Sequence, residues 1–268
     1  RYPTADSISA TAFETLLVRN GHPLHIDWHL HRLARGLRVL GLPDCADAAR
    51  VRIEEAAADA PAVAPHEASE SWASLRLTVT RGEGPRGYAP PLEPRPRLLT
   101  HLAPLPATVD PSEPAAPARL GIATTRWSTQ PLLAGIKHLN RLEQVLAARE
   151  VQLAGFDEAV MQDQDGQVIS VTAGNLFIVR DGKLLTPTLD RCGIAGTRRR
   201  LVLERWAPAL GLHAAEARIG LDELDSAEEV FYCNSVVGLR PVASLGNRRW
   251  QSHPVCAAMH DLCWSGLT

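Results

Sequence analysis

The sequence predicts an α+β fold divided into two domains, and three observations support this prediction. Short β-prone runs flank hairpin signals at Asn20-Gly21, Asp165-Gly166 and Asp181-Gly182. Other segments place apolar residues at helical spacing. One stretch is rich in proline, alanine and acidic residues and lacks periodicity, which is typical of a linker. We therefore expect a smaller domain at residues 1–105, a linker at 106–118 and a larger domain at 119–268.

The first half of the chain alternates strand and helix signals. Strands are expected at residues 13–18, 22–26, 75–80 and 98–102. Helices are expected after Asp27 and at 46–58, and the first has its apolar positions at Leu30, Leu33, Leu37 and Leu40. The loop at 81–88 matches G-x-G-x-x-G, but the prolines after it exclude the helix that a dinucleotide site requires.

The second half is expected to contain more strands than helices. The predicted strands are residues 120–124, 158–161, 167–170, 176–179, 183–186 and 229–233. Helices are expected after Asn140, from 193 to about 210 and at 254–264. Asn140 and Glu143 have the spacing of a capping box at the start of the first of these helices. Its apolar stripe comprises Leu142, Val145, Leu146 and Leu153.

The composition argues against several classes of protein. The net charge of −2 leaves no basic excess to neutralise nucleic-acid phosphates. No apolar run approaches the length of a membrane span, so we expect no membrane partner. The five cysteines are odd in number and scattered along the chain. This pattern indicates reduced thiols in a cytoplasmic protein, with neither a disulfide framework nor a metal site.

Lys137 is the candidate catalytic residue. The chain has only two lysines, and the other, Lys183, directly follows the Asp181-Gly182 turn, a typical place for a solvated lysine. Lys137 instead lies between apolar residues and the start of a helix. A desolvated lysine can lose its proton and act as an amine nucleophile, which arginine cannot do. The alternative is a surface lysine that leads into a helix.

The glycine-rich segment at 193–197 is a second candidate feature, because it leads into a helix. The N–H groups and the positive dipole end at such a junction suit a phosphate, although an ordinary loop-to-helix junction has the same pattern. Asn234 and Ser235 follow the end of a strand, where small polar groups often face a ligand. Asn234 is equally typical of a turn.

In combination these residues resemble the fold-type IV pyridoxal-phosphate enzymes, the class IV aminotransferase family. The most specific match is the run from Gly135 to Val145, Gly-Ile-Lys-His-Leu-Asn-Arg-Leu-Glu-Gln-Val. It is most similar to the lyases of this family that act on 4-amino-4-deoxychorismate. Further matches are collinear and cover nearly the whole chain, at residues 13–15, 29–33, 80–88, 174–177, 186–187 and 233–235.

The resemblance implies two α+β domains of the D-amino-acid aminotransferase type, with pyridoxal 5'-phosphate between them. Lys137 would form the Schiff base with this cofactor and then move protons. The residues implied to hold the cofactor phosphate are Arg32, Gly196, Thr197 and Ser235. Without the resemblance, Arg32 would be interpreted as a helix-surface arginine.

The resemblance also implies how substrate binds. Arg86 and Tyr88 match a loop that, in relatives, crosses a homodimer interface to bind the substrate carboxylate. An exposed loop arginine is the alternative for Arg86. Asn234 is a further candidate for contact with substrate or cofactor.

The sequence departs from the family pattern at two places. Relatives carry Gly-Asp-Gly where this chain has Ala10-Thr11-Ala12. Ser170 occupies the place, five residues before Asn175, where aminotransferases carry a glutamate that pairs with the pyridine nitrogen. That carboxylate keeps the ring protonated and able to accept electrons, whereas a serine holds the positive charge less well.

We therefore expect a lyase with a small-molecule substrate, which converts 4-amino-4-deoxychorismate into 4-aminobenzoate and pyruvate in folate biosynthesis. Aromatisation of the product supplies much of the driving force, so a weaker electron sink at Ser170 favours the lyase over a transaminase. The first alternative is a D-amino-acid or branched-chain aminotransferase of the same fold. The second is a non-catalytic relative with impaired cofactor binding, which the two departures would support.

Overall fold

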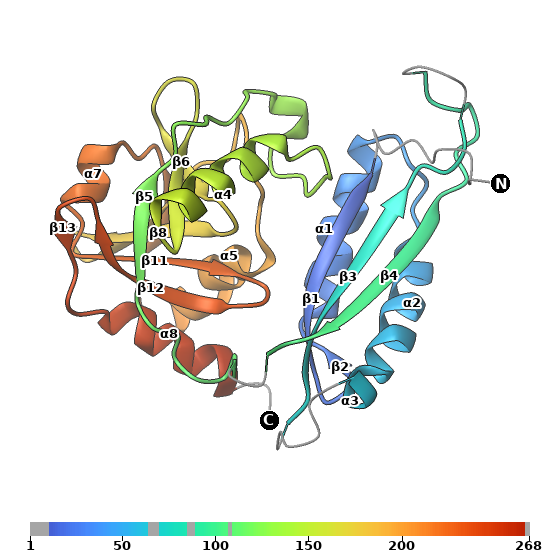
Figure 1. The fold of residues 1–268 in the computed structure, drawn as a ribbon, viewed down its shortest axis with the longest axis horizontal. Coiled ribbons are helices and arrows are strands. Elements are labelled where there is room, and N and C mark those ends of the chain that lie inside the picture. Colours follow the sequence, from blue (N-terminus) through green and yellow to red (C-terminus); the bar gives the residue numbers. More distant parts are fainter. Residues whose placement is uncertain (1–10, 64–69, 85–88, 107–108, 266–268) are drawn as a thin grey trace. The chain divides into compact units, whose positions relative to one another are not determined.

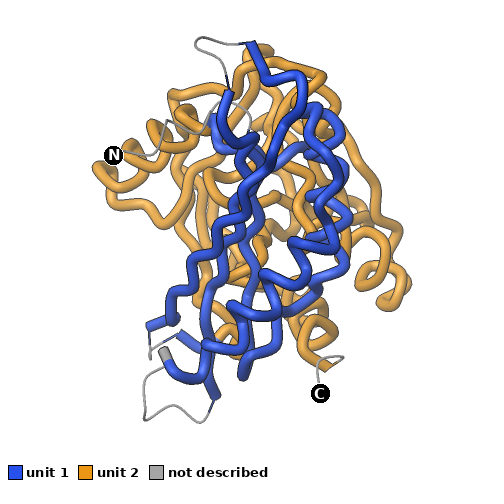
Figure 2. Tube along the Cα trace, turned by 90° about the vertical axis from the view of Figure 1, so that its right-hand side faces the viewer, with its two compact units in different colours: residues 1–110, 136–140 blue, residues 111–135, 141–268 orange. Residues whose placement is uncertain are grey.

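The computed structural model describes residues 11–63, 70–84, 89–106 and 109–265. The chain folds into two compact units, which Figure 2 shows in different colours. Unit 1 comprises Arg1–Asp110 with Ile136–Asn140, and unit 2 comprises Pro111–Gly135 with Arg141–Thr268. Asp110 lies in the stretch that we expected to be a linker. The sequence predicted a single division, whereas the chain returns to unit 1 for five residues that include Lys137.

Unit 1 is an antiparallel sheet with helices packed on its buried face. Its strands have the order β2-β1-β3-β4 and are β1 (Ala12–Arg19), β2 (His22–Pro23), β3 (Trp72–Thr80) and β4 (Arg97–Pro104). The helices are α1 (Ile26–Val39), α2 (Ala46–Ala58) and α3 (Ala60–Val63) (Figure 1). Alternate residues of β1 and β3, such as Leu16 and Leu75, are fully buried against α1 and α2. The return strand is shorter than predicted because α1 already begins at Ile26.

Unit 2 contains a nine-stranded mixed sheet in the order β10-β9-β8-β11-β12-β5-β6-β7, with β13 paired to β12. The strands are β5 (Ala118–Ile122), β6 (Glu158–Gln162), β7 (Val168–Val171), β8 (Asn175–Arg180), β9 (Lys183–Pro187), β10 (Ala214–Ala217), β11 (Glu229–Asn234), β12 (Gly238–Leu245) and β13 (Arg248–Arg249). Strand β5 pairs in parallel with both β12 and β6, and β9 pairs in parallel with β10. The remaining pairs are antiparallel. The predicted α+β class is confirmed.

The helices of unit 2 cover this sheet. They are η2 (Pro131–Leu133), α4 (Leu142–Ala154), α5 (Thr197–Leu201), η3 (Val202–Trp206), α6 (Ala207–Ala209), α7 (Leu221–Asp225) and α8 (Pro254–Ser265). The elements α5, η3 and α6 are one helical run whose middle turn is a π-helix, and this run is the helix predicted to end near Leu210. No helix in the described part of the chain has the length and apolarity to span a bilayer.

Helix α4 packs differently from its sequence pattern. The predicted apolar stripe is exposed, whereas Ala147 and Val151 on the other face are buried in the core beneath the helix. The exposed positions are Leu142, Val145, Leu146 and Leu153. The predicted capping box is also wrong, because the N-cap is Arg141 and the Glu143 carboxylate accepts the backbone N–H of Ser128.

The core of unit 1 provides a direct test of this packing. Leu37 on α1 is fully buried, whereas Val39, two residues later, is 47% exposed. We expect Leu37→Ala to lower the free energy of unfolding by about 2–5 kcal/mol, because it leaves a cavity among close-packed side chains. The matched control Val39→Ala should change it by less than about 0.5 kcal/mol. Urea unfolding followed by circular dichroism measures both, and equal losses would contradict the described core.

Candidate active site

Lys137 is held against strand β1 by backbone hydrogen bonds on both sides. The N–H of Phe13 donates to the carbonyl oxygen of Lys137 over 3.1 Å, and the N–H of Leu139 donates to that of Thr11 over 3.1 Å. The Lys137 side chain is half-buried, and its Nζ lies 4.2 Å from the centroid of the Phe13 ring. This arrangement fixes the backbone of the lysine and places its amine against an aromatic ring.

The segment just before Lys137 is bonded to the glycine-rich loop of unit 2. The N–H of Gly135 donates to the carbonyl oxygen of Gly193 over 3.0 Å, and the N–H of Ala195 donates to that of Gly135 over 3.1 Å. Gly135 has a φ of 79°, in the left-handed region that favours glycine. The lysine segment and the predicted phosphate loop are therefore joined by backbone hydrogen bonds.

Asn175, the first residue of β8, holds the same loop from its other side. Its Nδ2 donates to the carbonyl oxygen of Ile194 over 2.8 Å, and its Oδ1 accepts the N–H of Gly196 over 3.1 Å. A Cβ atom at position 196 would lie 2.1 Å from this Oδ1, so any other residue there would displace the Asn175 side chain. Both polar atoms of the side-chain amide of this buried asparagine thus bond the loop.

Thr197 and Ser235 are brought together by this loop. Thr197 begins α5, Ser235 directly follows β11, and their hydroxyl oxygens lie 3.1 Å apart. The neighbouring Asn234 has a different role, because its Oδ1 accepts the N–H groups of Val236 and Val237 and its Nδ2 donates to the carbonyl oxygen of Ala173. Its side chain forms a turn, and its predicted contact with substrate stays a prediction.

Ser170 is buried on β7 and is oriented by a tryptophan. The indole Nε1–H of Trp127 donates to the Ser170 hydroxyl oxygen over 3.0 Å. The guanidinium of Arg141 lies over the same indole, 5.1 Å from its centroid. The hydroxyl therefore has a neutral donor, and a cation lies over the ring that carries this donor.

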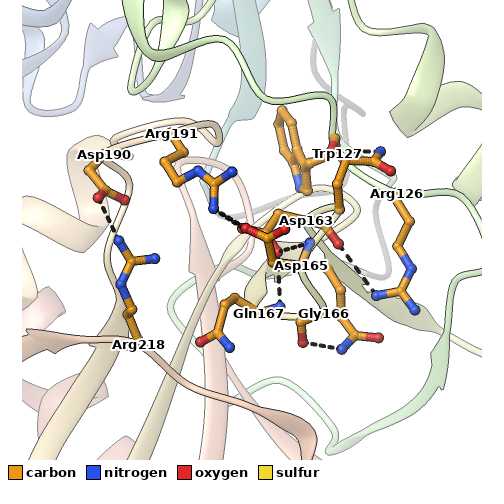
Figure 3. A network of polar contacts seen from close by, with 11 residues as sticks. Arg126, Trp127, Asp163, Asp165, Gly166, Gln167, Asp190, Arg191 and Arg218 are labelled. Carbon is orange, nitrogen blue, oxygen red and sulfur yellow. Dashed lines mark hydrogen bonds and ion pairs between the residues drawn. The ribbon is translucent and has the colours of Figure 1, made fainter.

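A polar network fixes the loop that precedes Gly193 (Figure 3). The buried carboxylate of Asp163 accepts the backbone N–H groups of Asp165 and Gln167. The guanidinium of Arg191 forms ion pairs with Asp163, at 3.9 Å, and with Asp165. The hairpin between β6 and β7 is therefore tied to the residues just before the glycine-rich loop, which limits the movement of that loop.

Arg32 is oriented by a buried carboxylate in unit 1. Its Nε donates to Oε1 of Glu14 over 2.9 Å and its Nη2 donates to Oε2, while Nδ1 of His29 lies 2.7 Å from Oε2. Burial alone would raise the pKa of Glu14, but the charge and hydrogen bonds of Arg32 and then of His29 outweigh it and lower the pKa to about 2. The fork-like pairing fixes the plane of the Arg32 guanidinium.

The predicted site residues fall into both units. Lys137 and Arg32 belong to unit 1, whereas Ser170, Gly196, Thr197 and Ser235 belong to unit 2. Arg86, Tyr88 and Ala10 lie outside the described residues. Within those residues, no group of three or more histidine, cysteine, aspartate or glutamate side chains is placed to hold a metal ion.

Several residues that support the site were not among the predicted site residues. They are Glu14, His29, Trp127 and Asn175. Two of them carry a signal in the sequence, because Glu14 is a polar residue inside a strand run and Asn175 directly precedes an apolar one. His29 and Trp127 carry no such signal, since their partners lie 15 and 43 residues away in the chain.

The Glu14 carboxylate should make a large contribution to stability. We expect Glu14→Gln to lower the free energy of unfolding by about 2–4 kcal/mol at pH 7, because it removes the buried carboxylate charge that pairs with the partly buried Arg32. The same exchange at the partly exposed Glu70, which pairs with Arg19, should cost less than about 1 kcal/mol.

This contribution should also depend on pH with a defined sign. The folded pKa of Glu14 is about 2 and its ordinary value is 4.5, so the stabilisation is complete above pH 4.5 and declines as the pH falls towards 2. Chemical unfolding between pH 6 and pH 3 measures it, and Glu14→Gln should flatten the profile. A variant as acid-sensitive as the wild-type chain would contradict this assignment.

Comparison with known proteins places these features in context. The model of the family described as amino-transferase class IV matches residues 11–245. The aminodeoxychorismate lyase of Vibrio harveyi is 33% identical over 241 residues, which is 87% of this chain and 82% of the relative.

Solved structures agree with this match. The crystal structure of 4-amino-4-deoxychorismate lyase from Pseudomonas aeruginosa is 40% identical, with a TM-score of 0.82, and the alignment covers 96% of this chain and 91% of that one. The fold IV transaminase CpuTA1 from Curtobacterium pusillum is 26% identical with a TM-score of 0.77, and the alignment covers 94% of this chain and 84% of that one. The predicted fold-type IV architecture is confirmed.

Proposed function

We propose a function on the premise that this chain belongs to the amino-transferase class IV family. The chain is a pyridoxal-phosphate-dependent lyase that converts 4-amino-4-deoxychorismate into 4-aminobenzoate and pyruvate, as a step of folate biosynthesis. The observation that supports this proposal is the similarity to aminodeoxychorismate lyases over most of both chains. In addition, the backbone of Lys137 is hydrogen-bonded to β1.

The donor groups of the described residues fit pyridoxal phosphate. Two hydroxyls 3.1 Å apart, Thr197 and Ser235, stand at the start of a helical run whose dipole favours a phosphate dianion. The tight contact of Asn175 with bare backbone at Gly196 shapes the loop that leads to them. In the proposed enzyme Arg32 would supply a guanidinium for the same phosphate, Lys137 would supply the amine for covalent attachment, and Ser170 would contact the ring.

The reaction then depends on what Lys137 does as a base and an acid. Bound pyridoxal phosphate supplies an electron-withdrawing ring that stabilises negative charge developing on the substrate. The free amine of Lys137 would accept the proton from the ring carbon of the substrate and would donate a proton to the departing enolpyruvyl group. The C–O bond breaks as the substrate ring becomes aromatic, and the released group ends as pyruvate.

Ser170 favours elimination over amino transfer. A neutral hydroxyl bonded to the Trp127 indole stabilises a positive charge less well than a carboxylate does, so it makes a weaker electron sink. Amino transfer depends on that sink in both half-reactions, whereas the elimination is helped by aromatisation. An aminotransferase of the same fold is therefore the second candidate.

The assembled enzyme that we propose is a cytoplasmic homodimer. In it the loop that carries Arg86 and Tyr88 extends across the interface, and Arg86 binds the carboxylate of the substrate in the neighbouring subunit.

The proposed role of Lys137 is tested by exchanging each lysine of the chain in turn. We expect Lys137→Ala to lose the visible absorption of the bound cofactor that borohydride removes, and to lower pyruvate release from 4-amino-4-deoxychorismate by at least about 100-fold. Lys183 is exposed in β9, so Lys183→Ala should retain both. A wild-type protein that stays colourless after reconstitution with pyridoxal phosphate would instead support a non-catalytic relative.

The choice between lyase and aminotransferase is tested on the wild-type protein. We expect kcat/KM for pyruvate release from 4-amino-4-deoxychorismate to exceed kcat/KM for amino transfer from D-alanine or branched-chain amino acids by at least about 100-fold. Efficient amino transfer from any of these donors would overturn the argument from Ser170 and favour the second candidate.

A further inference from the structure

Two cationic side chains lie over the ring of Phe13 in β1. The Lys137 Nζ lies 4.2 Å from the ring centroid, and the Arg76 Cζ lies over the same ring at 4.4 Å. Both distances are within the range of a cation–π interaction. The ring itself is half-buried, so part of its surroundings is apolar.

Backbone pairing enforces this arrangement on both sides of Phe13. In the antiparallel register of β1 and β3, Thr15 pairs with Arg76 and Phe13 pairs with Thr78. Arg76 is therefore the diagonal neighbour of Phe13 on one face of the sheet, a position from which long side chains contact an aromatic ring. Lys137 lies on the other side of β1, where its carbonyl oxygen accepts a hydrogen bond from the Phe13 N–H.

The Phe13 ring and Arg76 act on the charge of Lys137 in opposite directions. The face of an aromatic ring attracts an ammonium group and so stabilises the protonated amine. Arg76 repels it, because two charges that share one ring lie within roughly 9 Å of each other, although the exposure of Arg76 screens the effect. Of the other ionisable groups nearby, Glu14 lies on the opposite face of β1, where it contacts His29, and His138 follows Lys137 in the chain.

We propose that Phe13 is a positioning residue for Lys137, and that Arg76 acts on the same amine through the shared ring. The Phe13 ring contacts the Lys137 amine whenever this amine is not bonded to the cofactor. Arg76 disfavours the protonated form of the Lys137 amine. The amine therefore readily gives up a proton that it has taken from the substrate. This inference rests on the proposed function of Lys137 as the base. It adds to that function the place where the free amine is held.

The two-lysine composition makes a direct test possible. The full chain, freed of cofactor, is acetylated with trace acetic anhydride at a series of pH values, and mass spectrometry measures modification at Lys137 relative to the exposed Lys183. We expect Phe13→Leu to lower the pKa of the Lys137 amine by about 0.5–1 unit, which at a fixed pH below that pKa makes Lys137 about three- to tenfold more reactive. Phe13→Tyr keeps a ring and should keep the wild-type value.

Arg76→Gln provides an independent variant at an exposed position. It should raise the pKa of the Lys137 amine by a few tenths of a unit, because it removes a like charge. In the reconstituted enzyme, Phe13→Leu should lower kcat several-fold more than it changes KM, since the ring holds the amine and does not bind substrate.

The outcomes separate this inference from the proposed function. Lys137 titration curves that coincide for wild type, Phe13→Leu and Arg76→Gln would overturn the inference. If Phe13→Leu fails to fold, Arg76→Gln is sufficient as a test. A Lys137 titration curve in Arg76→Gln that equals the wild-type curve would overturn the inference. Added pyridoxal phosphate should protect Lys137, and not Lys183, from acetylation. Absence of this protection would defeat the proposed function, whereas the titration curves would still decide the role of Phe13.

Discussion

The site depends on the backbone hydrogen bonds that flank Lys137. Gly135 is bonded to the loop at Gly193 and Ala195, and two residues later the carbonyl oxygen of Lys137 accepts the N–H of Phe13. A flexible lysine side chain has several rotatable bonds, so its amine is positioned only if the backbone beneath it is fixed. Bonds on both sides supply this constraint, and the left-handed Gly135 between them lets the chain turn from one set to the other.

Both faces of strand β1 contribute side chains to the candidate site. Phe13 and Glu14 are adjacent, so their side chains point to opposite faces of the sheet. On one face the Phe13 ring contacts the Lys137 amine, and on the other the Glu14 carboxylate orients Arg32. Burying a carboxylate is unfavourable unless it is paired, and here a guanidinium and an imidazole both contact it. One strand thereby places an aromatic ring beside the proposed base, Lys137, and a paired carboxylate beside the predicted phosphate ligand, Arg32.

The sequence predicted most elements correctly, and it indicated Lys137 as a candidate, because both depend on local patterns. Hairpin signals mark tight turns whatever the rest of the chain does, and the scarcity of lysine, with only Lys137 and Lys183, is visible in the composition. Helix α4 shows where local patterns fail. Periodicity predicted its four large apolar residues correctly as one stripe, but periodicity does not say which stripe faces the core, and the sheet of unit 2 accepts the smaller Ala147 and Val151 instead. Likewise Glu143 fits a capping box in sequence, yet a distant backbone N–H, that of Ser128, binds its carboxylate.

Ser170 is the position where the surroundings explain a departure from the family pattern. The Trp127 indole offers a neutral N–H donor, and a buried hydroxyl satisfied by such a donor carries little desolvation cost. A carboxylate in the same place would lose its hydration, and burial would raise its pKa and favour its neutral form, whereas the Arg141 guanidinium over the same indole would act in the opposite direction. Trp127 therefore suits a hydroxyl better than a charge. In the proposed lyase, such a hydroxyl would contact the cofactor ring without enforcing its full protonation, which suits a reaction that aromatisation already drives.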